Sequence, residues 1–455
     1  MRSSSIFLDR RIVLAITYAP AGLGHLRVAD ALYHGLPKDV VPVLLGSDDT
    51  SITYIHRFSS IHPLTRALMV FWQQGLPEKI FTFFYRLYLL TSTEIIYKQL
   101  RTILSQRIDP VKTLVVVATH FGLAHQIAAI KEYLEKKEGI KIILVVQVTD
   151  DSPQLIWYVN GADMIFVPSV RTKESLLSYG QKAYRNFKQP KFIVAPYPVN
   201  PLMAINLPHY AFQSKLRQLS SEEDEEINIC IPLSGAAVGT DILYKIIKLL
   251  PANSTRFRFH IVAKEAPYTQ KFILDLLSDP HTLLHIGRSD REVIDLYDRL
   301  YQYQTIALEI TKPSEQAFKA LFSPRQKGGA ILLFLNPVGK QEYDNLDFLR
   351  RHGLIPSTKM KKILWDWSQG NISVNKHLEN EILKEALNWR GIELPKNSFD
   401  TVEFINFSLK KGIFSQMANF HMPSSLTENH KQEISPEGVD IFWDKVEEHL
   451  DRVAS

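Results

Sequence analysis

The sequence is poor in features that mark several classes of protein. Its one cysteine, Cys230, excludes a disulfide framework and a zinc site built from cysteines, and so little cysteine favours a reducing compartment. Residues 1–11 are polar and the apolar run after them has only the length of a strand, so they form neither a signal peptide nor a membrane span. Low-complexity segments and short repeats are also missing from the sequence. We therefore expect a globular, cytoplasmic chain.

The net charge of the chain does not by itself indicate one class of binding partner. The 53 Lys and Arg against 48 Asp and Glu leave a net charge of +5, and 45% hydrophobic with 22% charged residues is an ordinary globular composition. This mild basic excess does not indicate nucleic acid, and anionic lipid or phosphate substrates suit it equally. The 455 residues exceed one typical core, so we expect two domains of about 200 residues each.

A strand, a glycine-rich turn and a helix follow one another twice in the sequence. The apolar runs 12–16 and 227–231 each precede such a turn. The glycines of the two turns are Gly22, Gly24, Gly235 and Gly239. In units of this kind the helix N-terminus offers N–H groups and a positive dipole end to phosphate. We therefore predict an α/β protein with two Rossmann-like domains facing each other across a nucleotide-binding cleft.

The domain boundaries follow from the alternation of short apolar segments with amphipathic helices, which indicates parallel sheets covered on both faces. We predict a first domain over residues 1–205 and a second over 227–435, joined by a linker over 206–226. The acidic run at the end of this linker is typical of a solvated loop. The strand signal fades near residue 360, so a helical extension and a last helix over 436–455 are expected.

Polar residues follow three predicted strands of the first half. His25 begins the helix after the first turn, His120 follows the run 113–118, and Asp150 follows the run 141–148. In a parallel sheet these residues lie on one rim, where ligands bind. Imidazole titrates near neutrality, so His25 is a candidate general base or phosphate ligand, with His120 and Asp150 as rival bases. The alternative is that Asp150, or Asp151 beside it, caps the next element.

Three strands of the second half are also followed by polar segments that we expect to converge on one rim. With the four glycines, the candidates for nucleotide-sugar binding are Lys264, Lys312, Ser314, Glu315, Gln341, Glu342 and Asn345. Lys312 and the N–H groups near Ser314 suit a diphosphate, whereas Glu315 or Glu342 suits sugar or ribose hydroxyls. The alternative is that each residue caps a helix.

The segment 52–101 is rich in aromatic and basic residues and carries only two acidic ones. Such a mixture on one amphipathic surface suits a membrane interface with anionic headgroups. A pair of helices packed as core is the alternative. Single-stranded nucleic acid would suit the composition too, but no recognition motif accompanies it, so no nucleic-acid partner is expected.

Together these motifs resemble the monogalactosyldiacylglycerol synthases and processive diacylglycerol glucosyltransferases. The bacterial enzyme that adds N-acetylglucosamine to lipid-linked muramyl-pentapeptide is a more distant relative. The order and spacing of the matches agree over roughly residues 12–355. The matching segments are Gly22–His25, Thr119-His120, Thr149-Asp150, Val167-Pro168-Ser169, Gly235–Gly239, Thr311-Lys312-Pro313 and Gln341–Asn345.

The resemblance implies the GT-B fold, in which the C-terminal helix crosses back onto the first, acceptor-side domain. It implies an inverting hexosyl transfer from a UDP-sugar to a diacylglycerol-like lipid at the inner face of the membrane, with no metal and no cofactor besides the donor substrate. Accordingly, the sequence has no Asp-x-Asp metal motif. A glutamate that binds the ribose in the family has Lys319 or Ala320 in its place here, and Glu315 is the nearest substitute.

Two other functions fit the same twin-domain fold. One is a UDP-sugar 2-epimerase, which needs acidic residues around the sugar but no lipid surface. The other is a non-catalytic protein that binds a nucleotide sugar and kept the fold.

Overall fold

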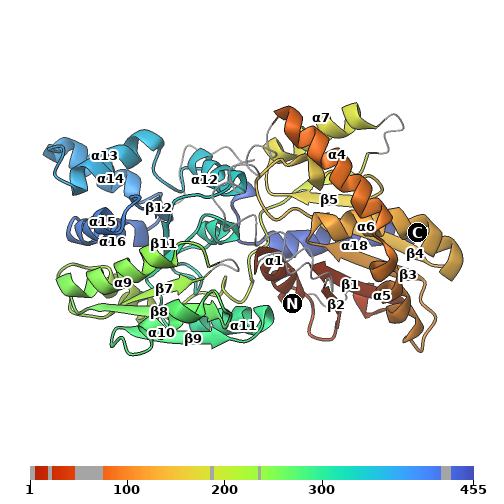
Figure 1. Ribbon diagram of the computed structural model, residues 1–455, viewed down its shortest axis with the longest axis horizontal. Coiled ribbons are helices and arrows are strands. Elements are labelled where there is room, and N and C mark those ends of the chain that lie inside the picture. Colours follow the sequence, from red (N-terminus) through yellow and green to blue (C-terminus); the bar gives the residue numbers. More distant parts are fainter. Residues whose placement is uncertain are drawn as a thin grey trace. The chain divides into compact units, whose positions relative to one another are not determined.

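The computed structural model describes residues 6–18, 23–46, 75–184, 189–233, 237–421 and 432–454. The chain forms two compact units (Figure 1). The first comprises Met1–Pro201 and Gln432–Ser455, and the second comprises Leu202–Lys431.

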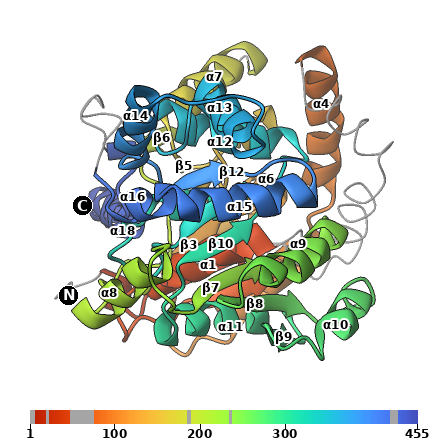
Figure 2. The same cartoon turned by 90° about the vertical axis from the view of Figure 1, so that its left-hand side faces the viewer.

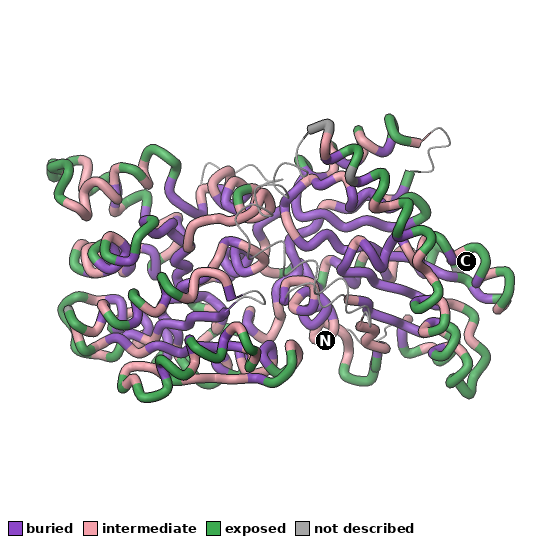
Figure 3. Tube along the Cα trace, in the orientation of Figure 1, coloured by how far each residue is buried: buried purple, intermediate pink, exposed green. Residues whose placement is uncertain are grey.

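The first unit is built on a six-stranded parallel sheet in the order β2-β1-β3-β4-β5-β6. Its strands are β1 Ile12–Tyr18, β2 Val43–Gly46, β3 Thr113–Ala118, β4 Lys141–Gln147, β5 Met164–Val167 and β6 Lys191–Val194. The inner strands are apolar and almost wholly buried because helices cover both faces of the sheet (Figure 3). The order reverses between β1 and β3, and ligands of such sheets bind at the carboxyl ends of the strands beside this point.

The helices of the first unit include one from the far end of the chain. They are η1 Ile6–Leu8, α1 Leu23–His34, α4 Gly75–Thr91, α5 Glu94–Ser105, α6 Phe121–Glu138, η2 Leu155–Trp157, α7 Val170–Ala183 and α18 Gly438–Ala454. In α18, the indole N–H of Trp443 donates to the carbonyl of Leu32 over 2.9 Å, and the ring of Phe442 lies 4.4 Å from that of Phe166. The last helix therefore completes the first unit, as the sequence predicts.

The second unit also contains six parallel strands, in the order β12-β11-β10-β7-β8-β9. They are β7 Ile227–Pro232, β8 Phe257–Lys264, β9 Thr282–Gly287, β10 Leu308–Thr311, β11 Ile331–Phe334 and β12 Gly391–Glu393. Numbered from β7, this is the Rossmann order 3-2-1-4-5-6, with its reversal between β7 and β10. The predicted fold class, α/β with two Rossmann-like domains, is confirmed by these two sheets.

The described helices of the second unit lie between its strands and after them. They are α8 His209–Gln218, α9 Thr240–Asn253, α10 Gln270–Leu276, α11 Asp290–Tyr303, η3 Glu315–Leu321, α12 Lys340–Arg351, α13 Thr358–Ser368, α14 Lys376–Ala386, α15 Ser398–Lys410 and α16 Ile413–Ala418. Helix α9 packs against α15, and α8 against α16 (Figure 2). The buried face of α9 contributes Ile246 and Ile247 to the same apolar core as Phe404 of α15.

One sequence expectation about this unit is wrong. The segment 206–226 is not a linker, because it contains α8, whose Lys215 is buried and donates to the carbonyls of Pro324 and Gly329. Burial, with the positive charges of Arg390 and Lys319, lowers the pKa of Lys215 well below its usual value. The stretch after residue 360 is mainly helical, as expected, and it also adds β12 to the sheet, whose three residues are too few for a recognisable strand pattern.

Candidate functional site

The carboxyl edge of the first sheet carries the three predicted catalytic candidates. His25 and Gly24 lie in the first turn of α1 after β1, and His120 directly precedes α6 after β3. Asp150 follows β4 and is half-buried. Gly22 lies outside the described residues. Since β1 and β3 are neighbours at the reversal of strand order, their loops meet at the ligand-binding edge.

His25 is oriented by a backbone carbonyl. Its Nδ1 lies 2.7 Å from the carbonyl oxygen of Thr119 and 3.2 Å from the hydroxyl of Thr149. A carbonyl oxygen only accepts hydrogen bonds, so Nδ1 carries the proton and Nε2 is the basic nitrogen of the neutral ring. The hydroxyl of Thr119 in turn donates either to the carbonyl of His25, over 2.9 Å, or to that of Thr17, over 3.1 Å. The contact between Nδ1 and the carbonyl of Thr119 fixes the tautomer in which Nε2 of His25 can accept a proton.

His120 has the opposite tautomer. It is the N-cap of α6, and its Nδ1 accepts from the backbone N–H of Gly122 over 3.1 Å. In the neutral ring Nε2 therefore carries the proton, which makes His120 a hydrogen-bond donor rather than a base. The two imidazoles meet edge to face, with centroids 4.8 Å apart. The geometry favours His25 over His120 as the base, a choice that the residue types alone leave open.

The two aspartates after β4, Asp150 and Asp151, differ in their burial. The carboxylate of Asp151 is buried and accepts from the hydroxyls of Ser169 and Thr172, the latter over 2.8 Å. Ser169 caps α7, so Asp151 stabilises the start of that helix. Asp151 therefore has a structural role without being an N-cap itself, and Asp150 stays a candidate for catalysis.

Aromatic side chains connect this edge to α4. The ring of Phe121 lies 4.5 Å from that of His120 and 5.4 Å from that of Trp157 in η2. The ring of Trp157 is 6.3 Å from His25, and Tyr85 of α4 is 6.2 Å from Phe121. The part played by Tyr85 and Phe121 is missed from the sequence because it depends on where α4 packs.

The outward face of α4 is apolar. Large side chains that are 42–64% exposed gather on it, namely Ile80, Phe83, Phe84, Leu87, Tyr88 and Leu90. Among the α4 side chains that the structure describes, Glu78 is the one carboxylate, and it is buried. The part of the predicted aromatic and basic segment before residue 75 lies outside the described residues. From residue 75 on, this segment is two helices, α4 and α5, and α4 presents apolar side chains to the outside.

In the second unit, the turn after β7 begins α9. Gly235 lies outside the described residues. Gly239 is the N-cap of α9 with φ 91°, a left-handed conformation that favours glycine, and Ala237 also has a positive φ of 47°. This backbone aims the first N–H groups of α9 out from the edge beside β10.

Three of the other predicted binding residues, Lys264, Glu342 and Asn345, have structural partners at this edge. Lys264, at the end of β8, pairs with Asp290 over 2.9 Å. Glu342 accepts from the backbone N–H of Val338 over 2.5 Å and so closes the start of α12. Asn345 is fully buried and its amide donates to the carbonyl of Pro313 over 3.3 Å. Gln341, in the first turn of α12, is half-buried.

Lys312, Ser314 and Glu315 lie where β10 leads into η3, and all three are half-buried. The amide of Asn345 holds Pro313 between them, so α12 supports this loop. All three follow β10, the strand that neighbours β7 at the reversal of strand order.

Lys319 is one of the two residues, with Ala320, that the resemblance puts at the place of a ribose-binding glutamate, and it is part of a buried network. Its ammonium lies 2.5 Å from Oε2 of Glu309 on β10. The same oxygen accepts from the hydroxyls of Tyr297, over 2.8 Å, and Tyr301. Burial and the neighbouring Glu309 charge raise the pKa of Tyr301 well above its usual value. Lys319, which belongs to η3, therefore stabilises the second unit through this buried network.

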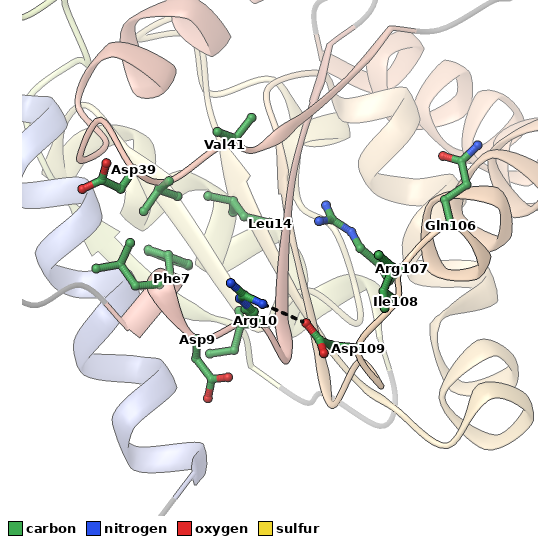
Figure 4. A pocket seen from close by; sticks show the side chains of 13 residues that line it. Phe7, Asp9, Arg10, Leu14, Asp39, Val41, Gln106, Arg107, Ile108 and Asp109 are labelled. Carbon is green, nitrogen blue, oxygen red and sulfur yellow. Dashed lines mark ion pairs between the residues drawn. The ribbon is translucent and has the colours of Figure 1, made fainter.

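A hollow of about 440 Å³ lies at the opposite, amino edge of the first sheet (Figure 4). Leu14, Phe7 and Val40 form part of its lining, and Arg10 pairs with Asp109 at 3.9 Å beside it. Since the lining residues precede β1, β2 and β3 or lie at the start of β1, this hollow is remote from His25 along the sheet.

Two buried histidines predict a loss of stability in mild acid. Desolvation lowers the pKa of His125 to about 3 and, with the His285 charge, that of His260 to about 4. The unfolded chain binds protons below its ordinary pKa of 6.5 while the native rings do not, so stability falls as pH drops from 6.5 towards 4. We expect a loss of roughly 3 kcal/mol for each ring by pH 4.

Thermal unfolding followed between pH 7 and 4.5, where most carboxylates stay ionised, tests this expectation. The His260→Gln variant keeps a donor for Asn228 but does not titrate, so its unfolding should depend less steeply on pH. An unchanged pH dependence in both His260→Gln and His125→Gln would contradict the assignment.

No protein-family model matches the sequence, and no curated protein matches it. Solved structures with a similar fold include UDP-sugar epimerases and glycosyltransferases. The UDP complex of S. aureus MnaA is 11% identical and has a TM-score of 0.48, covering 98% of this chain and 98% of that one. UDP-GlcNAc 2-epimerase from Neisseria meningitidis, bound to UDP-GlcNAc, is 11% identical with a TM-score of 0.47, covering 96% and 99%. Anabaena Alr3699/HepE, in complex with UDP and glucose, is 12% identical with a TM-score of 0.44, covering 96% and 100%.

Likeness at this level concerns the arrangement of the chain, not what it binds. Within the described residues, none of the helices combines the length and the apolar character that crossing a bilayer requires.

Proposed function

We propose that this protein is an inverting, metal-independent glycosyltransferase of the GT-B type. It would move a hexose from a UDP-sugar to a diacylglycerol-like lipid at the inner surface of a membrane. The observation that carries the proposal is the hydrogen bond from Nδ1 of His25 to the carbonyl of Thr119, because it makes Nε2 the basic nitrogen at a ligand-binding edge.

In the proposed reaction, Nε2 of His25 accepts the proton of the acceptor hydroxyl. The hydroxyl oxygen then attacks the anomeric carbon, and the bond from that carbon to the diphosphate breaks. Asp150 is the second candidate for the base. His120 donates a hydrogen bond rather than accepting the proton, in keeping with its tautomer.

The leaving diphosphate needs positive charge and N–H donors. The start of α9 after Gly239, the ammonium of Lys312 and the backbone near Ser314 are the groups proposed to hold it, with Glu315 on the sugar or ribose. Gln341 is the proposed sugar contact from α12. Lys264, Glu342 and Asn345 support the loops around it through the partners described above.

The proposed lipid surface is the outward face of α4. Its apolar side chains face away from the unit, and the exposed cation Lys79 precedes them, which suits anionic headgroups. A lipid acceptor would then be presented next to Tyr85 and Phe121, which lead to His25.

Thermal shift against UDP-sugars, followed by mass spectrometry of lipid products, tests the function. A UDP-sugar that binds the native state raises the unfolding temperature, and a glycosylated diacylglycerol should accumulate with the same sugar. Conversion of the UDP-sugar into its 2-epimer without lipid would establish the epimerase instead. Binding without turnover would indicate the non-catalytic protein, and absence of binding would contradict all three.

Vesicle binding is expected to depend on the exposed rings of α4. Phe83 and Phe84 are 62% and 64% exposed, and burying each fully in an apolar phase gains about 1.5–3 kcal/mol. The double variant Phe83→Ser, Phe84→Ser should weaken sedimentation with phosphatidylglycerol vesicles by about tenfold or more.

The matched control is Leu274→Ser, Leu277→Ser, which removes two side chains of similar exposure from the second unit and should leave vesicle binding unchanged. Equal binding by both double variants would contradict the lipid surface. A change in sedimentation as an oligomer, without vesicles, would mean that α4 contacts a second copy.

A further inference from the structure

The polarity of α4 is inverted relative to an ordinary surface helix. Its inward face carries Glu78, Thr82 and Leu89, which are buried, and Arg86, which is half-buried. Surface helices usually turn their apolar stripe inward and their charges outward. Here two of the three charged side chains, Glu78 and Arg86, point into the unit, so the helix is held by directed hydrogen bonds as well as by apolar packing.

The two inward charges of α4 bind the backbone of η2. The carboxylate of Glu78 accepts from the N–H of Leu155 over 3.0 Å. The guanidinium of Arg86 donates to the carbonyls of Leu155 and Tyr158, each over 3.3 Å, and to the hydroxyl of Tyr179 over 3.1 Å. Glu78 and Arg86 therefore hydrogen-bond to the backbone N–H and to the carbonyl oxygen of the same residue, Leu155. We call this pair of side chains the α4 clamp.

The position of Arg86 is fixed on its other sides as well. Its guanidinium lies 5.5 Å from the ring centroids of Tyr179 and Tyr184, a cation–π arrangement that keeps the fork pointed at η2. From the opposite side, Nε2 of His125 on α6 donates to the carbonyl of Ile156 over 2.9 Å. Three side chains from two helices thus hydrogen-bond to the backbone of η2 and its C-cap residue.

What η2 carries makes the clamp relevant to the candidate site. Trp157 is buried and packs edge to face on Phe121, with its ring 6.3 Å from that of His25. A shift of η2 moves Trp157 and so changes the wall beside the imidazole. Helix α4 is consequently connected to the proposed base, His25, through η2 and the side chain of Trp157.

We propose that Glu78 and Arg86 are positioning residues, which hold η2 and Trp157 against His25 when the apolar face of α4 is seated on a lipid surface. This inference rests on the proposed function for the meaning of the site. A lipid surface that immobilises α4 then orders the acceptor edge, so that the protein is more active on vesicles than on a dispersed acceptor. In this proposal α4 is the element through which a lipid surface raises the activity.

Hydrogen exchange at the Leu155 amide tests the clamp without requiring turnover. In wild-type protein, vesicles of phosphatidylcholine with phosphatidylglycerol should slow exchange of the peptide around Leu155 by about fivefold or more. Glu78→Ala should raise its exchange in the absence of vesicles and remove the response to them. Glu78→Gln keeps an acceptor oxygen for the Leu155 N–H and should behave like wild type.

Arg86→Met should lose the response as well, whereas Arg86→Lys keeps one donor and should retain part of it. A peptide covering β4, a buried strand of the same unit, reports whether each variant is folded and should not change. If the Glu78→Ala and Arg86→Met variants fold and respond to vesicles as wild type does, the clamp is refuted.

Turnover distinguishes failure of the clamp from failure of the function. If the protein is a lipid glycosyltransferase, Glu78→Ala should lower kcat on vesicles severalfold while KM for the UDP-sugar stays constant. If no variant turns over any UDP-sugar, the proposed function fails, and the exchange experiment still decides the clamp.

Discussion

Replacing His25 by asparagine is expected to lower turnover about 10²- to 10⁴-fold, the usual loss when a general base is removed. Asparagine keeps a hydrogen-bonding group at the start of α1 but cannot accept a proton at neutral pH. Binding of the UDP-sugar, measured by thermal shift, should remain, because the base acts on the acceptor. The measurement is the initial rate of UDP release with vesicles that contain diacylglycerol.

The tautomer argument supplies the control for this variant. In His120→Asn the side-chain oxygen still accepts from the Gly122 N–H, so α6 keeps its cap and only a ring donor is lost. Its turnover should fall less than that of His25→Asn. Asp150→Asn measures the rival base: a larger loss there than at His25 would assign the proton transfer to Asp150.

Replacing Lys319 by methionine is expected to destabilise the second unit by about 3–5 kcal/mol, the usual cost of leaving one partner of a buried ion pair alone. The carboxylate of Glu309 is fully buried, and Lys319 is its charged partner at 2.5 Å. Urea unfolding measures the loss. The tyrosine hydroxyls on the same oxygen remain in place, but they are neutral.

The double variant Glu309→Gln, Lys319→Met removes both charges and should recover most of this stability. A different result is expected if Lys319 binds the nucleotide, at the place where the resemblance described above expects a ribose-binding glutamate. In that case Lys319→Met would reduce UDP affinity and leave the free energy of unfolding nearly unchanged. The two measurements on one variant therefore separate a structural lysine from a ligand-binding one.

The fold could be predicted from the sequence because buried parallel strands are apolar along their whole length. The runs before Gly22 and Gly235 are such strands, and they became β1 and β7, the central strands beside the reversal of each sheet. β12 could not be found in this way. Three residues carry no periodicity, and β12 exists because it pairs with β11.

The candidate site could be predicted only as a set of residue types on two sheet edges. The sequence proposed His25, His120 and Asp150 together, since each follows a strand. The distinction between the two imidazoles depends on a carbonyl 94 residues away from His25 and on an N–H two residues away from His120. The first of these contacts exists only after β1 and β3 have paired.

Composition and pattern alone determined the α/β class, the two units and the edges where ligands are expected, because these follow from which segments must be buried. Tertiary structure alone decided which side of α4 faces outward, which histidine is basic and that Lys319 is paired. A side chain's proton, charge and direction depend on its neighbours in space, and those neighbours come from distant parts of the chain.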